Sequence, residues 1–64
     1  MKWTKQDKYH ITSGNYTICK IYLAGIPRYE LWVREGKNAK CIATGELESL
    51  KQQAKHLHNG KDSP

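Results

Sequence analysis

Lysine, arginine and aromatic side chains alternate with apolar residues through the middle of this 64-residue chain. The side chains best suited to binding chemistry all occupy even-numbered positions. Because alternate residues of a β-strand point to the same face, extended segments would gather them on one surface. Aromatic rings stack on bases or sugars and cationic side chains hold phosphates, so the pattern is typical of a nucleic-acid-binding face. The candidate binding residues are Lys20, Tyr22, Arg28, Trp32, Arg34 and Lys40.

An acidic residue, Glu30, shares this even-numbered set and would repel phosphates. The same face is also suited to a protein partner or a second copy of the chain, with Trp32 and Tyr22 as aromatic anchors. Glu30 fits this second hypothesis better than the first. Salt separates the two hypotheses, because binding to nucleic acid falls steeply with ionic strength.

Other side chains that could carry chemistry do not form a recognisable site. Cys19 and Cys41 are far apart in the sequence and lack the paired spacing of zinc ligands. His56 and His58 are two residues apart, so a helix would point them in different directions. No nucleophile, base and supporting acid can be grouped from the pattern. We therefore expect free thiols, no metal, no cofactor and no enzymatic activity.

The net charge of +5 favours acidic partners, which include nucleic acids, acidic proteins and anionic membranes. Residues 1–8 lack the apolar stretch of a secretory signal. The longest apolar run is far short of a membrane span, so no membrane partner is expected. These features predict a cytoplasmic protein.

The elements that must position these residues are short. Two β-rich runs flank a Gly/Pro break at residues 25–27, which indicates a hairpin. We predict an α+β fold, in which a three-stranded antiparallel meander packs on one C-terminal helix. The predicted strands are 16–23, 28–34 and 39–44, with a short extra strand allowed at 9–12. The predicted domain is 9–60, with a flexible arm at 1–8 and a disordered tail at 61–64.

A capping pattern predicts the start of the helix, with Ser49 as N-cap and Gln52 reaching back to it. Gly60 is the predicted end. Within these limits the apolar residues are spaced to form one narrow stripe, which must pack on the sheet because so short a helix is unstable alone. The stripe is Leu50, Ala54 and Leu57.

A three-residue loop at 25–27 would place Leu23 opposite Tyr29 and gather the odd-numbered side chains on the helix side. The even-numbered face would then be open, unless the N-terminal arm folds back and covers Trp32 with Trp3. Both arrangements remain open from the sequence. The predicted core residues on the strands are Cys19, Ile21, Leu23, Tyr29, Leu31 and Val33.

About two thirds of the chain resembles small phage and prophage proteins of unknown function. The resemblance rests on Tyr-Thr-Ile-Cys-Lys at 16–20, Gly25 with Arg-Tyr-Glu-Leu-Trp at 28–32, Leu47 with Ser-Leu at 49–50, and Ala-Lys at 54–55. It implies the cytoplasm of a bacterial host cell. It does not imply an activity. The alternative to DNA binding, a factor that binds a host or phage protein, rests on the aromatic anchors of the even-numbered face.

The expected architecture is also similar to AP2-type domains and to the arm-binding domains of phage integrases. Those domains lay the sheet face opposite the helix into the major groove of DNA. The resemblance implies that the six candidate residues on the even-numbered face would contact the DNA. It implies a fold more directly than a function.

Overall fold

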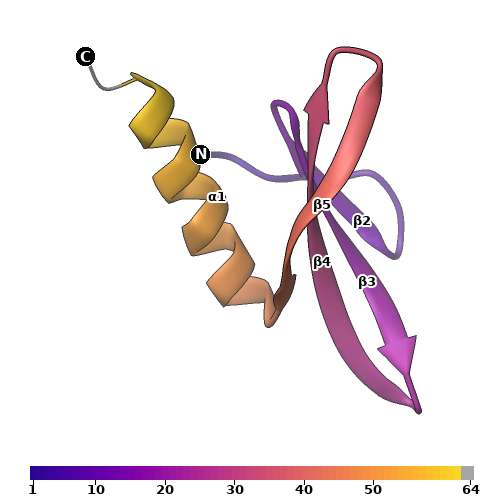
Figure 1. Cartoon of the computed structure of the whole chain (residues 1–64). Coiled ribbons are helices and arrows are strands. Elements are labelled where there is room, and N and C mark those ends of the chain that lie inside the picture. Colours follow the sequence, from indigo (N-terminus) through magenta and orange to yellow (C-terminus); the bar gives the residue numbers. More distant parts are fainter. Residues whose placement is uncertain (63–64) are drawn as a thin grey trace.

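A five-stranded antiparallel sheet followed by one helix makes up the fold, so the predicted three-stranded meander is wrong. The computed structural model describes residues 1–62, and residues 60–62 by their backbone alone. Each strand pairs with its neighbour in the sequence, and the helix lies against one face of the sheet (Figure 1). The elements are β1 (Thr4–Lys5), β2 (His10–Ser13), β3 (Tyr16–Leu23), β4 (Ile26–Glu35), β5 (Asn38–Gly45) and α1 (Leu47–Asp62).

A two-residue turn joins β3 to β4 and sets their register. Both of its residues have a positive φ, 53° at Ala24 and 80° at Gly25, as a type I′ hairpin turn requires. Pro27, which we predicted in the loop, lies in β4 opposite Tyr22. In a two-residue hairpin the closing pair, here Leu23 and Ile26, is hydrogen-bonded, and the next pair, here Tyr22 and Pro27, is not. Pro27 lacks an N–H, but at this position it loses no hydrogen bond to β3.

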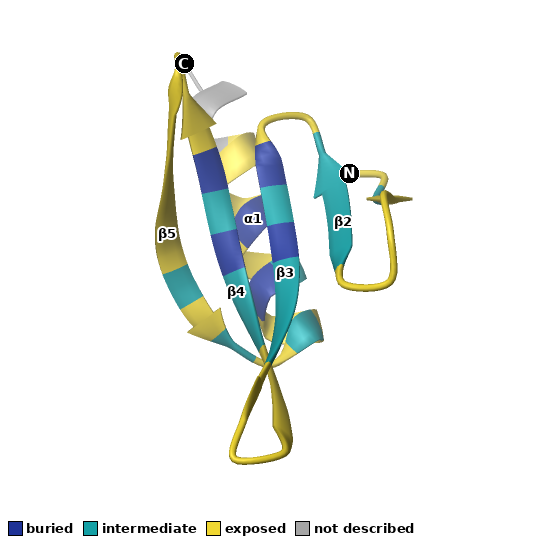
Figure 2. Ribbon diagram, turned by 90° about the vertical axis from the view of Figure 1, so that its right-hand side faces the viewer, coloured by how far each residue is buried: buried dark blue, intermediate teal, exposed yellow. Residues whose placement is uncertain are grey.

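This register changes which face of β3 is buried. Ile18 lies opposite Leu31, where the three-residue loop would have placed Ile21. Because the shift is odd, it moves every side chain of β3 to the other face. The prediction that Cys19, Ile21 and Leu23 belong to the core is therefore wrong. The buried core, shown dark blue in Figure 2, is Tyr16, Ile18, Leu31, Val33, Leu50 and Ala54.

Helix α1 begins before the predicted cap. The N–H of Leu50 donates to the carbonyl of Glu46 at 3.0 Å, so the first helical turn already encloses Ser49. The helix continues through Gly60, the predicted end, to Asp62. The core positions of Leu50 and Ala54 are confirmed, because both are fully buried. Along residues 1–62, no helix combines the length and apolarity needed to cross a membrane.

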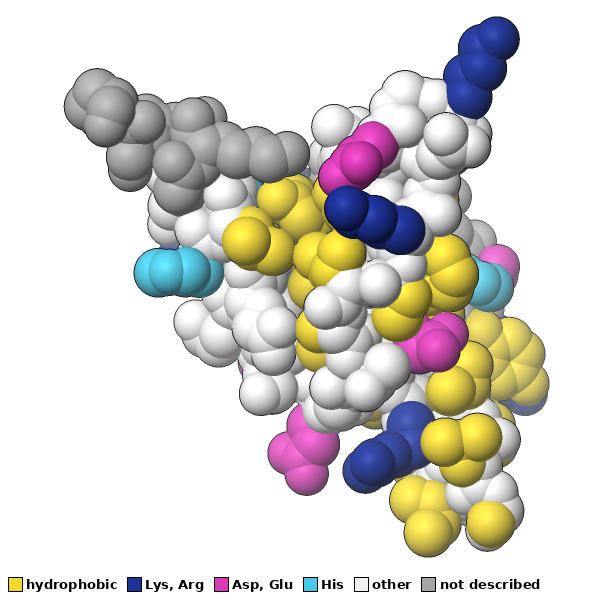
Figure 3. All heavy atoms as spheres, viewed as in Figure 1, with side chains coloured by type: hydrophobic (Ala, Val, Ile, Leu, Met, Phe, Trp, Pro, Cys, Tyr) yellow, Lys and Arg dark blue, Asp and Glu magenta, His cyan; other side chains and the backbone are white. Residues whose placement is uncertain are grey.

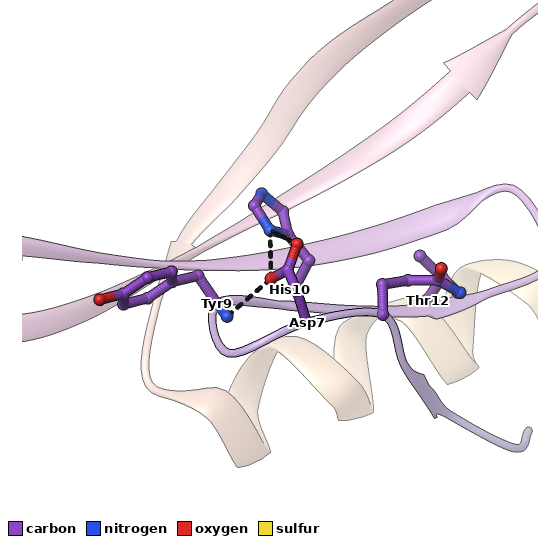
Figure 4. Close-up of polar contacts among 5 residues, drawn as sticks. Asp7, Tyr9, His10 and Thr12 are labelled. Atoms are coloured by element: carbon purple, nitrogen blue, oxygen red, sulfur yellow. Dashed lines mark hydrogen bonds and ion pairs between the residues drawn. The ribbon is translucent and has the colours of Figure 1, made fainter.

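The N-terminal segment joins the sheet through a loop organised by Asp7 (Figure 4). A carboxylate oxygen of Asp7 accepts the N–H of Tyr9 at 2.8 Å and lies 2.8 Å from Nδ1 of His10. The contact with His10, followed by the bond from Tyr9, lowers the pKa of Asp7. The carbonyl of Tyr9 accepts the N–H of Lys20 at 2.7 Å, which ties the loop to β3. These contacts of the Asp7 carboxylate are therefore retained at neutral pH and weaken as the pH falls through the lowered pKa.

Strand β1 lies within the segment that we predicted as an arm, and pairs with β2. Trp3, next to β1, packs against the buried core on the helix side, so it does not cover Trp32. Of the predicted tail, residues 61 and 62 belong to α1. Ser63 and Pro64 lie outside the described residues.

The strained turn residue gives a first prediction. Ala24 has a left-handed conformation that L-residues other than Asn and Asp adopt at a cost of about 1–2 kcal/mol. Ala24→Asn should raise the free energy of unfolding by about 1 kcal/mol, because Asn-Gly is the favoured type I′ pair. Urea denaturation measures the difference. Gly25→Ala is the opposite control and should destabilise the protein; a less stable Ala24→Asn variant would contradict the turn assignment.

The change of face gives a second prediction. Ile18 is 1% exposed and Ile21 is half-buried on the other face of the same strand. Removing one methylene by Ile18→Val should cost about 1 kcal/mol of stability. The matched Ile21→Val change should cost less than about 0.5 kcal/mol. Equal costs, or a larger cost at Ile21, in urea denaturation would favour the register that we predicted from the sequence.

Candidate functional site

The face of the sheet that points away from α1 has no helix over it (Figure 1). The central strand β4 supplies this face with four side chains, at alternate positions to the buried Leu31 and Val33. Residues paired with them on β3 and β5 point the same way. We call this surface the open face. Strand β2 adds His10 and Thr12, which pair with open-face residues of β3. The open-face residues are His10, Thr12, Thr17, Cys19, Ile21, Arg28, Glu30, Trp32, Arg34, Ala39, Cys41 and Thr44.

The six candidate residues from the sequence divide between the two faces. Arg28, Trp32 and Arg34 lie on the open face. The other three lie on the helix side, because Lys20 is paired with the half-buried Tyr29, Tyr22 with Pro27, and Lys40 with the buried Val33. The structure therefore brings together half of the predicted set and separates it from the rest.

An irregularity in β5 accounts for the position of Lys40. Leu31 pairs with Ala43 and Trp32 with Cys41, so Ile42 is an extra residue on β5. Such a bulge reverses the alternation of the strand beyond it. Cys41 thereby joins the open face and Lys40 the helix side. The sequence around Ile42 has no glycine that would have indicated the bulge.

Trp32 lies at the centre of the open face, half-buried between Thr17 of β3 and Cys41 of β5. Its indole Nε1 donates a long hydrogen bond, 3.4 Å, to Oε1 of Glu30. The bond directs the polar edge of the indole along β4 toward Glu30. Glu30 therefore orients the aromatic ring, a role that the sequence pattern did not reveal.

The charges on the open face are arranged along β4. Arg28 and Arg34 are exposed, and neither takes part in an ion pair among residues 1–59, whose side chains are described. On the helix side, the ammonium of Lys40 lies 3.4 Å from Glu35. The open face thus presents two guanidinium groups to solvent beside one oriented indole.

Lys20 and Tyr22 interact with each other on the helix side. The ammonium of Lys20 lies 5.4 Å from the centre of the Tyr22 ring. A hydrogen bond to Tyr22 raises the pKa of Lys20. The pair is thus separated from Trp32 by the thickness of the sheet, and the two cannot contact one ligand in the way that the sequence predicted.

Both cysteines are free and lie on the open face, on either side of β4. Two strand spacings across the sheet, and two residues along it, separate them by more than about 10 Å, which is too far for a disulfide. Burial raises the pKa of the Cys19 thiol, and the nearby charge of Glu30 adds to the effect. Cys41 is exposed. The two thiols therefore lie on either side of β4, Cys19 opposite Glu30 and Cys41 opposite Trp32, and differ in accessibility.

Comparison of the chain with protein-family models, with curated proteins and with solved structures finds no match in any of the three. The resemblance to phage proteins and to AP2-type domains stays a prediction from the sequence. Within the part of the chain that the structure describes, no three His, Cys, Asp or Glu side chains are grouped to hold a metal ion.

The cysteines give a third prediction. At pH 8, iodoacetamide should alkylate Cys41 several-fold faster than Cys19. Only the thiolate reacts, and the Cys19 thiol is half-buried and has a raised pKa. Mass spectrometry of tryptic peptides follows each thiol. In urea the two rates should converge. Faster labelling of Cys19 in the folded protein would contradict its position in the sheet.

Proposed function

We propose that the open face binds nucleic acid, with Trp32 stacking on a base and the two arginines of β4 contacting phosphates. The observation that carries this proposal is the alternation of Arg28, Trp32 and Arg34 along the uncovered face of the central strand, around an indole that Glu30 orients. Aromatic rings held on an open sheet are used in this way to stack bases. A bacterial cytoplasm, predicted from the sequence, is the proposed compartment.

The spacing along β4 favours a single strand over a duplex. Alternate residues of a strand are about 6.7 Å apart, so Arg34 lies one such step from Trp32 and Arg28 lies two steps away on the other side. A single strand lying along β4 can place one base on the indole and a phosphate near each guanidinium. A duplex keeps its bases stacked on one another and offers none to Trp32.

The charge of the open face sets the expected salt dependence of nucleic-acid binding. Two arginines supply two phosphate contacts, and Glu30 between them opposes a third. For single strands, the plot of log binding constant against log salt concentration has a slope of about −0.7 for each phosphate contact. Two contacts therefore give an expected slope of about −1.4. The net charge of +5 adds long-range attraction.

Binding of a fluorescent mixed-sequence oligonucleotide, followed by anisotropy at several salt concentrations, gives a fourth prediction. Trp32→Ala should weaken binding at least about fivefold, because base stacking contributes about 1–3 kcal/mol. Arg34→Gln should reduce the slope to about −0.7. A duplex of the same sequence should bind more weakly than the single strand.

Lys40→Gln is the matched control, because it removes one positive charge from the helix side. It should leave the slope close to that of the unchanged protein. If Trp32→Ala binds as tightly as the unchanged protein, or if Lys40→Gln and Arg34→Gln change the slope equally, the open face is not the nucleic-acid site.

A protein partner is the second candidate, and Glu30 is the observation that favours it. The order Arg28, Glu30, Trp32, Arg34 places a negative charge among positive ones around an aromatic anchor, as in many protein interfaces. A host or phage protein, or a second copy of the chain, could match this pattern. Binding would then be lost in Trp32→Ala but tolerate salt, and sedimentation at several concentrations would reveal a dimer.

A further inference from the structure

The end of the β3–β4 hairpin projects beyond the rest of the sheet. Strand β5 reaches only to Gly45, opposite Tyr29, and β2 begins at His10, opposite Cys19. Residues 21–27 therefore have no neighbouring strand on either side. Figure 1 shows α1 leaving the base of this ribbon in the opposite direction, so the helix does not cover it either. We call residues 21–27 the hairpin tip.

The hairpin tip is apolar and exposed. Its sequence, Ile-Tyr-Leu-Ala-Gly-Ile-Pro, has no charged residue and is bounded by Lys20 and Arg28. Tyr22, Leu23 and Ile26 are 53%, 58% and 60% exposed, more than any other large hydrophobic residue for which exposure is described. Figure 3 shows hydrophobic side chains covering this lower end of the molecule beside cationic ones. Monomeric proteins rarely leave such side chains together in water without a binding role.

Both faces of the hairpin tip are apolar. Leu23 and Ile26 pair on the side of the open face, and Tyr22 and Pro27 pair on the helix side. A partner that docked on one face would leave the other in water. Insertion of the tip into an apolar medium covers both faces at once.

The backbone of the tip also favours an apolar surrounding. At the strained position of Ala24 an asparagine would fit the turn better, but it would place a polar amide at the outermost point. The backbone groups of the Tyr22–Pro27 pair point outward from the ribbon, and Pro27 has no N–H to leave unpaired. Proline at this position thus leaves one unpaired N–H fewer at the edge of the tip than another residue would.

We propose that the hairpin tip inserts into the surface of an anionic phospholipid bilayer. Three residues of extended chain reach about 10 Å, which matches the depth at which interfacial elements bury their apolar side chains. Lys20 and Arg28 then lie at the level of the lipid phosphates, and Tyr22 lies at the interface, where tyrosine is enriched. Attachment of this kind needs no membrane span.

Charge and size favour a lipid surface over a second copy of the chain. Each copy carries +5, so two copies repel each other and an anionic surface attracts both. Seven residues are too few to bury the roughly 1,200–2,000 Å² of a stable protein interface.

Co-sedimentation of the full chain with vesicles tests the proposal. The protein should partition onto phosphatidylglycerol–phosphatidylcholine vesicles at low salt and at least about tenfold less onto pure phosphatidylcholine. Leu23→Ser with Ile26→Ser should lower the partition onto the anionic vesicles at least about tenfold. Both side chains are exposed, so the double variant should unfold at the same urea concentration as the unchanged protein.

Leu57→Ser is the matched control, because Leu57 is 44% exposed on α1 and distant from the tip in sequence and fold. It should bind vesicles as the unchanged protein does. A Tyr22→Trp variant, with the two native tryptophans changed to phenylalanine, should shift its emission to the blue on the vesicles and be quenched by brominated lipids. Adsorption by charge alone would give neither change.

Three outcomes would overturn the proposal. They are an absence of binding to anionic vesicles, an equal loss in Leu57→Ser, or a Tyr22→Trp signal that lipid leaves unchanged. Concentration-dependent sedimentation without lipid, abolished by the Leu23→Ser and Ile26→Ser pair, would assign the tip to a second copy instead. The inference does not depend on nucleic-acid binding, which the tip variants should retain.

Discussion

The two-residue turn between β3 and β4 is the constraint on which the rest of the structure depends. With Ala24 and Gly25 both at positive φ, the strands can pair only in the register that places Ile18 opposite Leu31. That register decides which side of β3 meets α1, and so which residues form the core. It also leaves Arg28, Trp32 and Arg34 together on the open face and carries Lys20 and Tyr22 to the other side. Core and candidate site therefore follow from one local geometry.

Much of the packing could be predicted from the sequence where only one face of an element is apolar. Leu31 and Val33 lie at alternate positions of β4 between the charged Glu30 and Arg34, and Leu50 and Ala54 form a clear helical stripe, so their burial could be predicted. Strand β3 has apolar residues on both faces, and its periodicity could not choose between them. The choice depends on the turn. We predicted Pro27 in the loop, although a non-hydrogen-bonded strand position also accepts proline.

The candidate site was predictable to the same extent. The open-face residues of β4 could be grouped because that strand alternates cleanly. Lys20 and Tyr22 were misplaced with the rest of β3, and Lys40 was misplaced by the bulge at Ile42, which has no signal in the sequence. Strand β1 was missed because two residues are too few to show a period. The bond from Trp32 to Glu30 depends on two side-chain conformations, which no residue pattern describes.

The strand order has a consequence for how the chain folds. Every strand pairs with the one before it in the sequence, so the sheet can grow by closing short loops alone, and such local topologies fold fast for their strand number. We expect the central hairpin to form first, because β2 and β5 add to its two edges and α1 packs against both of its strands. Strain at Ala24 then belongs to the transition state as well as to the native state. It slows the formation of the sheet and has little influence on how slowly the finished protein unfolds.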